Sequence, residues 1–121
     1  VNTTPHTPET DLMFNTNRFN LMKSSSYFIN IGRGKVCSLD DLCEAIELNK
    51  IAGCGLDVYE IEPLPENHKL WDLDNVIITP HIAVNGVEDI NDRRYQVLSG
   101  NIHNFINGKS LKNIVDKNKW Y

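Results

Sequence analysis

Residues 53–65, GCGLDVYEIEPLP, place the strongest constraint on the fold, because an apolar segment runs directly into an acidic loop that contains two prolines. Small and apolar side chains at 53–56 favour a short strand packed on both faces, as in parallel sheets. Asp57 then falls at the carboxyl end of this strand. The prolines cannot donate to a β ladder, so Glu60 and Glu62 belong to a stiff loop that leaves the sheet. In open α/β sheets this edge is where ligands bind.

Two further short runs have the composition of strands, one before and one after this stretch. Residues 27–31 are rich in aromatic and β-branched side chains and lead into a loop with Arg33 at its centre. Residues 75–79 form a buried-type strand that leads into His81. The order strand, helix, strand, loop, strand predicts parallel strands with right-handed crossovers, so that their carboxyl ends lie at one edge of a sheet.

Helical periodicity accounts for much of the remaining chain. Residues 39–49 carry apolar side chains at helical spacing, with Ser38 and Asp41 in the positions of a capping box. A short helix is predicted to begin at residue 15 or 16 and to end at residue 22. A long helix is predicted from about residue 87 to residue 106, where a glycine soon ends it.

The composition describes an ordinary globular protein and argues against several classes of function. Hydrophobic residues make up 40% of the chain, charged residues 23%, and the formal net charge is -4. Basic residues are scattered, which argues against nucleic acid as a partner. No apolar run approaches the roughly 20 residues that cross a bilayer, and no signal peptide opens the chain. We therefore expect a cytoplasmic protein with no membrane partner.

The cysteines and histidines do not indicate a metal centre. Cys37, Cys43 and Cys54 are odd in number and lack a C-x-x-C spacing, so we expect free structural thiols rather than disulfides or a zinc site. The His6-x-x-Glu9 spacing is weak as a metal pair. No metal site is predicted.

Each predicted strand end delivers a polar group to the same edge of the sheet. Arg33 follows the first strand, Asp57 and Glu62 follow the second, and His81 follows the third. Taken singly, an arginine in a glycine loop is commonly a surface charge, and a histidine after a proline is commonly structural. A cation, carboxylates and an imidazole from three successive strand ends together indicate a functional site.

Four segments carry more specific motifs: 4–10 (TPHTPET), 28–34 (FINIGRG), 52–63 (AGCGLDVYEIEP) and 75–83 (NVIITPHIA). Their order and spacing closely resemble the D-isomer-specific 2-hydroxyacid dehydrogenase family, and the resemblance covers nearly the whole chain. It implies an enzyme that interconverts 2-keto and 2-hydroxy acids with a nicotinamide cofactor, in a cleft between a Rossmann domain and a substrate domain.

By this resemblance the catalytic residues are Arg33, Glu62 and His81. Arg33 would hold the carboxylate and carbonyl of the substrate, and His81 would be the acid and base. Glu62, rather than Glu60, would be the partner of His81, and Asp57 would bind the nicotinamide carboxamide. The side-chain chemistry is consistent with these roles, because the planar guanidinium of Arg33 can donate two parallel hydrogen bonds to a carboxylate. Carbonyl reduction also needs a proton donor within hydrogen-bond reach.

The resemblance also implies cofactor contacts and partners. Family positions that line the adenosine and ribose side of NAD, mostly through backbone groups, are matched by Thr4, Pro5, Thr10, Ile31 and Gly32. The other expected cofactor residues are Arg33, Asp57, His81 and Ala83. For Thr10 a turn-forming hydroxyl is an equally open interpretation. NADP use stays open, and so does the substrate, among glyoxylate, hydroxypyruvate and phosphoglycerate-type acids. A homodimer is expected for the full-length protein.

The expected fold class is α/β, with a partial Rossmann-type parallel sheet and flanking helices, followed by a long helix and a tail. Residues 1–85 would form the C-terminal half of a NAD-binding Rossmann domain, and residues 86–121 the connecting helix and tail that return to a substrate domain. The family's G-x-G-x-x-G phosphate loop is absent from this sequence, so we expect the chain alone to be incomplete and inactive.

A second class of function stays open, namely a family member that binds NAD as a sensor, because a fold can be kept after its catalytic activity is lost. The retained Arg33, Glu62 and His81 favour the enzyme, since a pure sensor need not keep an acid/base pair.

Overall fold

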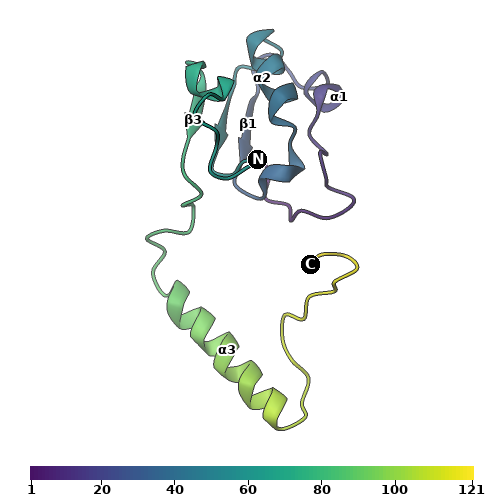
Figure 1. Cartoon of the computed structure of the whole chain (residues 1–121), viewed down its shortest axis with the longest axis vertical. Helices are drawn as coiled ribbons and strands as arrows, with labels where there is room; N and C mark the ends of the chain where they lie inside the picture. Colours follow the sequence, from purple (N-terminus) through teal and green to yellow (C-terminus); the bar gives the residue numbers. More distant parts are fainter. The chain divides into compact units, whose positions relative to one another are not determined.

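Three short strands form one parallel sheet in the order β1-β2-β3: β1 (Tyr27–Asn30), β2 (Gly53–Leu56) and β3 (Val76–Ile78) (Figure 1). In this computed structural model, which describes residues 1–121, Cys54 of β2 is in register with Phe28 on one side and Val76 on the other. The predicted α/β class and the parallel strand order are therefore confirmed. β1 ends one residue earlier than predicted, and β3 is one residue shorter at each end. The Asn75 carbonyl and the Thr79 amide on either side of β3 still bond to β2.

Helix α2 (Leu39–Glu47) follows β1 and begins where the capping pattern predicts. The hydroxyl of Ser38 accepts a hydrogen bond from the Asp41 amide at 3.3 Å. The reciprocal half of the capping box does not form, because the Ser38 amide donates to the carbonyl of Phe14 and the Asp41 carboxylate accepts from the amide of Thr16. Asp41 thereby ties α2 to the first residue of α1 (Thr16–Phe19), a single turn that is shorter than predicted.

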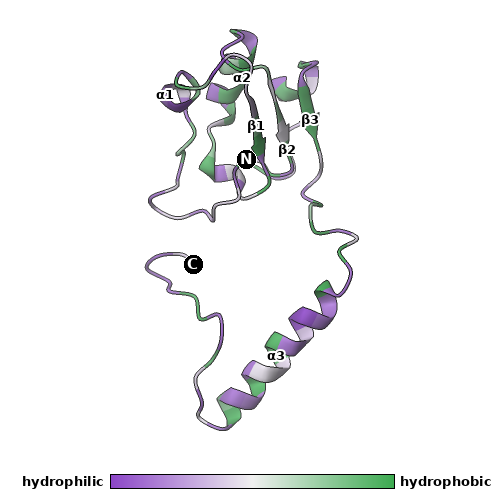
Figure 2. Cartoon of the chain, turned by 180° about the vertical axis from the view of Figure 1, so that it is seen from behind, coloured by the Kyte–Doolittle hydropathy of each residue, from purple (hydrophilic) through white to green (hydrophobic).

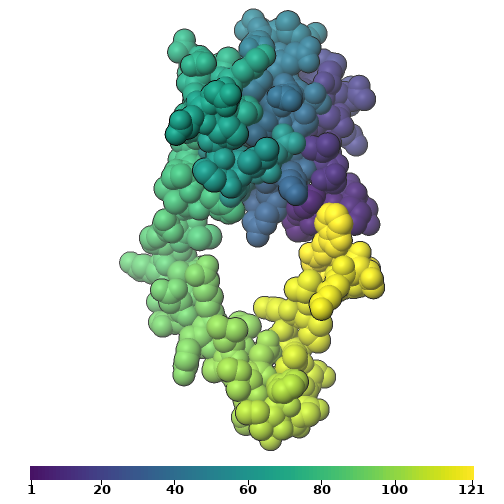
Figure 3. Space-filling model, viewed as in Figure 1, coloured from purple at the N-terminus to yellow at the C-terminus, as the bar shows by residue number.

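The core lies between α2 and one face of the sheet. Strand alternation turns Phe28 of β1 and Leu56 of β2 towards α2, where they pack with Leu42 and Ile46. All four side chains are at most 3% exposed. The space-filling view shows this part of the chain, purple to teal, as a densely filled body (Figure 3). Removal of this apolar surface from water is the main force that holds the sheet to α2.

The three cysteines are free and buried, as predicted. Burial raises the pKa of Cys43 to about 11 and that of Cys54 to about 12, and it raises the pKa of Cys37 further still. These thiols therefore stay protonated at neutral pH and act as small apolar groups in the core.

The chain divides into two compact units, Val1–Ala83 and Val84–Lys119. The first holds the sheet and also two 3-10 helices, η1 (Gly34–Val36) and η2 (Lys69–Asp72). The second holds α3 (Ile90–Ile106), which begins three residues later than the sequence predicts. Asp89 at its start has a left-handed backbone, with φ 62°, and its side chain makes no capping bond. No helix combines the length and the apolar character that crossing a membrane requires.

Candidate functional site

The loops that follow the three strands carry Arg33, Glu62 and His81 to one cavity of about 250 Å³. Arg33 comes from the loop after β1, Glu62 from the loop after β2, and His81 from the loop after β3. Tyr59 and Gly34 also line this cavity. The convergence follows from the parallel sheet, because its strands all end at the same edge.

His81 and Glu62 form a direct pair in this cavity. Nδ1 of His81 lies 2.7 Å from Oε2 of Glu62, and the other oxygen of Glu62 accepts a hydrogen bond from the Tyr59 amide at 3.0 Å. Burial opposes ionisation of Glu62. The bonds from His81 and Tyr59 and the positive charge of Arg33 outweigh burial and lower the pKa of Glu62 below its ordinary value. An ionised carboxylate only accepts hydrogen bonds, so Nδ1 of His81 is the donor of this pair.

Glu60, the alternative partner considered for His81, is used elsewhere. Its Oε2 accepts a hydrogen bond from the Leu39 amide at 2.7 Å. Glu60 thereby caps the first turn of α2, where a negative charge is favoured by the helix dipole. Glu60 also lines the cavity, but the carboxylate that bonds to His81 is that of Glu62.

The Arg33 loop is held by close packing of backbone on backbone. A Cβ atom on Gly34 would overlap the backbone of Tyr59, and a Cβ on Gly32 would lie 2.8 Å from the carbonyl oxygen of Thr4. The two glycines therefore let the loop approach its neighbours on both sides of Arg33. The Arg33 side chain is exposed, and one nitrogen, Nη1, donates to the carbonyl of Gly32 at 2.8 Å. A guanidinium has five N–H donors, so most of its capacity stays available for an anion.

Two buried amides that the sequence analysis missed hold this loop in place. Asn30 is 1% exposed and Asn2 is 3% exposed, and they share a hydrogen bond of 2.9 Å. Oδ1 of Asn30 accepts from the Gly32 amide, and its Nδ2 donates to the carbonyl of Arg33. The sequence feature that could have identified Asn30 is the alternation of side-chain direction along β1, which puts Asn30 on the same core-facing side as Phe28. A polar side chain at such a position needs internal partners.

Asp57 is almost completely buried at the end of β2, with 4% of its surface exposed. It accepts hydrogen bonds from the Thr79 hydroxyl at 2.6 Å, from the Ile82 amide at 2.9 Å and from the Ala83 amide at 2.9 Å. Burial opposes ionisation, but these three bonds outweigh it and lower the pKa of Asp57 below its ordinary value. The carboxylate is therefore ionised at neutral pH and bound to the segment that carries His81.

Thr4 and Thr10, which are also expected around NAD, lie in the loop at the start of the chain and make local hydrogen bonds. The Thr4 hydroxyl donates to Asn2, and the Thr10 hydroxyl donates to the carbonyl of Pro5 and accepts from the Thr7 amide. Thr10 thus closes a turn, which is the alternative that its sequence context left open.

Further residues expected at the cofactor lie at the ends of β1 and β2. Ile31 is 46% exposed, an apolar side chain beside the backbone of Gly32. Asp57 is close by, because its amide donates to the Asn30 carbonyl at 3.0 Å. An exposed apolar side chain beside a glycine backbone suits the adenosine and ribose side of a dinucleotide, and a carboxylate can accept a hydrogen bond from a carboxamide. The residues present therefore fit the cofactor.

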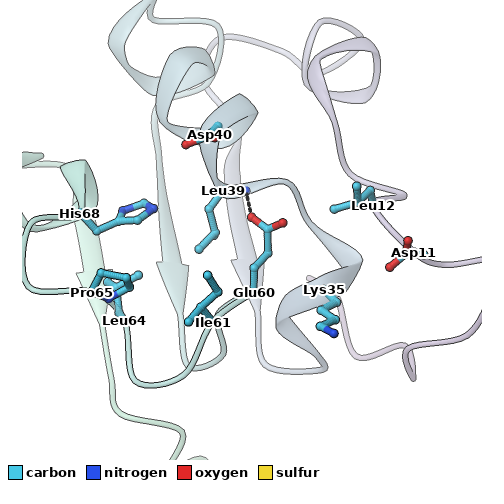
Figure 4. Close-up of a pocket in the computed structure, with 10 residues that line it drawn as sticks. All are labelled: Asp11, Leu12, Lys35, Leu39, Asp40, Glu60, Ile61, Leu64, Pro65 and His68. Carbon is cyan, nitrogen blue, oxygen red and sulfur yellow. Dashed lines mark hydrogen bonds between the residues drawn. The ribbon is translucent and has the colours of Figure 1, made fainter.

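A larger cavity of about 570 Å³ lies beside the start of α2 (Figure 4). Figure 4 shows Glu60 bonded to Leu39 between Lys35 and Ile61. None of the three expected catalytic residues lines it. No group of three histidine, cysteine or acidic side chains in the chain has the geometry to hold a metal ion.

A parallel α/β sheet with polar side chains gathered at its carboxyl edge is typical of α/β proteins that bind ligands, dinucleotides among them, at this edge. The chain belongs to the D-isomer specific 2-hydroxyacid dehydrogenase family, since the model of that family's NAD binding domain matches residues 1–83. Oxidoreductase chemistry and NAD binding are properties of this family.

Individual relatives agree with this assignment. The chain is 50% identical over 77 residues to glyoxylate reductase/hydroxypyruvate reductase of Homo sapiens. The aligned stretch covers 64% of this chain and 24% of the human protein. A 2-hydroxyacid dehydrogenase from Xanthobacter autotrophicus, solved with NADPH and MES, superposes with a TM-score of 0.86 at 36% identity, over 94% of this chain and 46% of that one.

A glyoxylate/hydroxypyruvate reductase of Sinorhizobium meliloti, solved with NADP and sulfate, gives a TM-score of 0.85 at 32% identity, over 98% of this chain and 38% of that one. The chain spans about a third of the length of the curated relatives it matches, 36% and 33% in two of them.

Proposed function

We propose that the protein containing this chain is a NAD(P)-dependent 2-hydroxyacid dehydrogenase that interconverts a small 2-keto acid and its 2-hydroxy acid. The observation that carries the proposal is the contact of 2.7 Å between His81 and Glu62, in a cavity that Arg33 also lines. The relatives named for glyoxylate and hydroxypyruvate favour substrates of that size, with phosphoglycerate-type acids as the larger alternative.

Each of the three side chains has a role that its chemistry suits. Arg33 binds the carboxylate and carbonyl of the substrate with its donor fork. His81 gives a proton to the carbonyl oxygen during reduction and takes it back during oxidation. Glu62 accepts from Nδ1, which orients the ring and leaves Nε2 to face the substrate. The nicotinamide, when bound, supplies the hydride.

The cofactor in this proposal is NAD, with NADP as the other candidate, because two solved relatives contain NADPH or NADP. Its contacts are the nine residues at the carboxyl edge and in the first loop: Thr4, Pro5, Thr10, Ile31, Gly32, Arg33, Asp57, His81 and Ala83. Residues 1–85 act as the second half of the NAD-binding domain, and residues 86–121 return towards a substrate domain. The full-length protein is a homodimer in this proposal.

The experiment replaces His81 by alanine in the full-length protein and measures reduction of glyoxylate and hydroxypyruvate with NADH and with NADPH. Loss of a general acid costs about 10²- to 10⁴-fold, so we expect kcat to fall by about 10³-fold. His103→Ala changes an exposed histidine of α3 and is the matched control, expected to retain activity. Unchanged reduction by His81→Ala would remove the assigned acid. A wild-type protein that binds NAD but reduces neither acid would support the cofactor-sensing alternative.

Arg33→Lys is the second variant in the same assay. Lysine keeps the charge but loses the planar fork, so we expect both a higher KM for the keto acid and a lower kcat. The KM for the cofactor is measured in the same assay, because Arg33 is also one of the proposed cofactor contacts. If that KM alone rises, Arg33 contacts the cofactor and not the substrate.

A further inference from the structure

The backbone of His81 has an uncommon conformation. Its φ is 53°, in the left-handed region that non-glycine residues rarely adopt. Such a conformation persists only where the surrounding structure enforces it. Within the turn itself the His81 amide donates a hydrogen bond to the Thr79 carbonyl at 3.0 Å. Other contacts must therefore help to hold this backbone conformation.

Three further bonds to this turn come from one side chain outside it, that of Asp57. Asp57 accepts bonds from Thr79 before His81 and from Ile82 and Ala83 after it. All three donors come from the five residues 79–83, so a single buried carboxylate closes the turn on both sides of His81. Because Asp57 is only 4% exposed, water does not compete strongly for these bonds.

A neighbouring tyrosine strengthens the same connection. The Tyr59 hydroxyl donates to the Thr79 carbonyl at 2.8 Å, and the Tyr59 amide donates to Glu62 at 3.0 Å. Tyr59 therefore contacts the start of the His81 turn with one group and the partner of His81 with another. The two loops that carry the pair are held to each other through the end of β2.

We propose that Asp57 is a positioning residue, which aims the His81 ring at Glu62 by holding residues 79–83 in a left-handed turn. The pair is then preformed in the absence of any ligand. This role goes beyond the carboxamide contact assigned to Asp57 above, and its catalytic meaning rests on the proposed function. The geometric inference itself concerns only this chain, so it can fail or succeed independently of the reaction.

The test is Asp57→Asn in the 121-residue chain without cofactor, followed by NMR. An asparagine offers one acceptor where the carboxylate offers two, and its NH₂ group faces donors. We expect amide exchange at Ile82 and Ala83 to accelerate by about tenfold or more while the core amide of Cys54 keeps its protection. We also expect loss of the His81 Nδ1 proton signal, which the bond to Glu62 protects from water.

Asp41→Asn is the matched control, because Asp41 is also a carboxylate that accepts from a backbone amide, that of Thr16 at 2.9 Å. It should accelerate exchange at Thr16 and leave Ile82, Ala83 and the His81 signal unchanged. If Asp57→Asn fails to fold, Thr79→Val removes the 2.6 Å bond to Asp57 together with the longer 3.4 Å bond to the Leu56 carbonyl. It leaves the bonds of Asp57 to Ile82 and Ala83 in place and should give a smaller acceleration of about threefold at these two amides.

The outcomes separate the two roles of Asp57. An intact His81 signal together with unchanged exchange at Ile82 and Ala83 in Asp57→Asn, or in Thr79→Val where that is the variant that folds, would overturn the positioning role. Asp57 would then act only on the cofactor. Loss of the His81 signal in Asp57→Asn, together with a full-length wild-type protein that lacks reductase activity, would leave the geometry correct and the proposed function wrong.

Discussion

Both units of the chain contain a helix with apolar residues at helical spacing, but these residues are buried in the first unit and exposed in the second. In the first unit α2 buries Leu42 and Ile46 at 0% and 3% exposure. In the second unit α3 also carries apolar residues at helical spacing, which Figure 2 shows as green segments among purple ones. Ile102 and Phe105 are nevertheless 61% and 76% exposed, and no residue of α3 is buried. Periodicity therefore identifies a helix, whereas burial depends on a partner surface. The first unit contains its own partner in the sheet.

The largest effect should come from removing core volume in the first unit. Leu42→Ala deletes a fully buried side chain, and such changes cost about 3 kcal/mol through lost apolar contact and the cavity left behind. Ile102→Ala in α3 should cost less than about 1 kcal/mol, because its side chain is already mostly in water. Urea unfolding of both variants measures the difference. Equal losses would show that α3 is packed in solution and would break the comparison.

The next effect concerns the loop that carries Arg33. Gly34→Ala adds a methyl group that overlaps the backbone of Tyr59, and overpacking of this kind costs about 2 kcal/mol. Gly100→Ala in α3 is the matched change, because a Cβ there meets no atom within 4 Å. Alanine favours a helix, so this control should stabilise slightly. Thermal unfolding reports both, and a tolerated Gly34→Ala would mean that the Arg33 loop is not tightly packed.

Changes at the helix caps should affect the stability of α2 and α3 differently, by a smaller free energy than the changes above. Ser38→Ala removes the hydroxyl that caps α2 and should cost about 1 kcal/mol. Asp89→Gly at the start of α3 removes no capping bond and relieves a left-handed backbone, so it should not destabilise. Helical signal by circular dichroism during urea unfolding checks both. A clear loss for Asp89→Gly would contradict the absence of a cap.

The smallest effect is the response to acid in the first unit. The pKa values of Asp57 and Glu62 lie below their ordinary values of 3.8 and 4.5, so the folded state binds fewer protons than the unfolded chain. Their contribution is present above pH 4.5 and is lost as the pH falls through and below this range. Unfolding free energies at pH 6 and pH 3.5 measure it. Asp57→Asn should reduce this pH dependence, and a variant as acid-sensitive as the wild type would contradict the assignment.

Much of the first unit could be predicted from the sequence because its signals are local. The small and apolar run that forms β2, the Ser38 cap and the order of the strands all follow from neighbouring residues and short connections. The convergence of Arg33, Glu62 and His81 also follows, since parallel strands share an edge.

The contacts that hold the site could not be predicted in the same way. The bonds of Asp57 to Ile82 and Ala83 join positions 25 and 26 residues apart. The Asn2 to Asn30 bond joins positions 28 residues apart. The left-handed backbone at His81 has no sequence signal either, because glycine or asparagine is the usual residue there. Such features depend on the assembled fold and not on local propensity.

The most direct test of the central claim is a double-mutant cycle between Glu62 and His81 in the full-length protein. Glu62→Gln, His81→Asn and the double variant are compared by kcat/KM for glyoxylate reduction. Because the two side chains act through one contact of 2.7 Å, the double variant should be no slower than His81→Asn alone. Independent effects that multiply in the double variant would contradict the account.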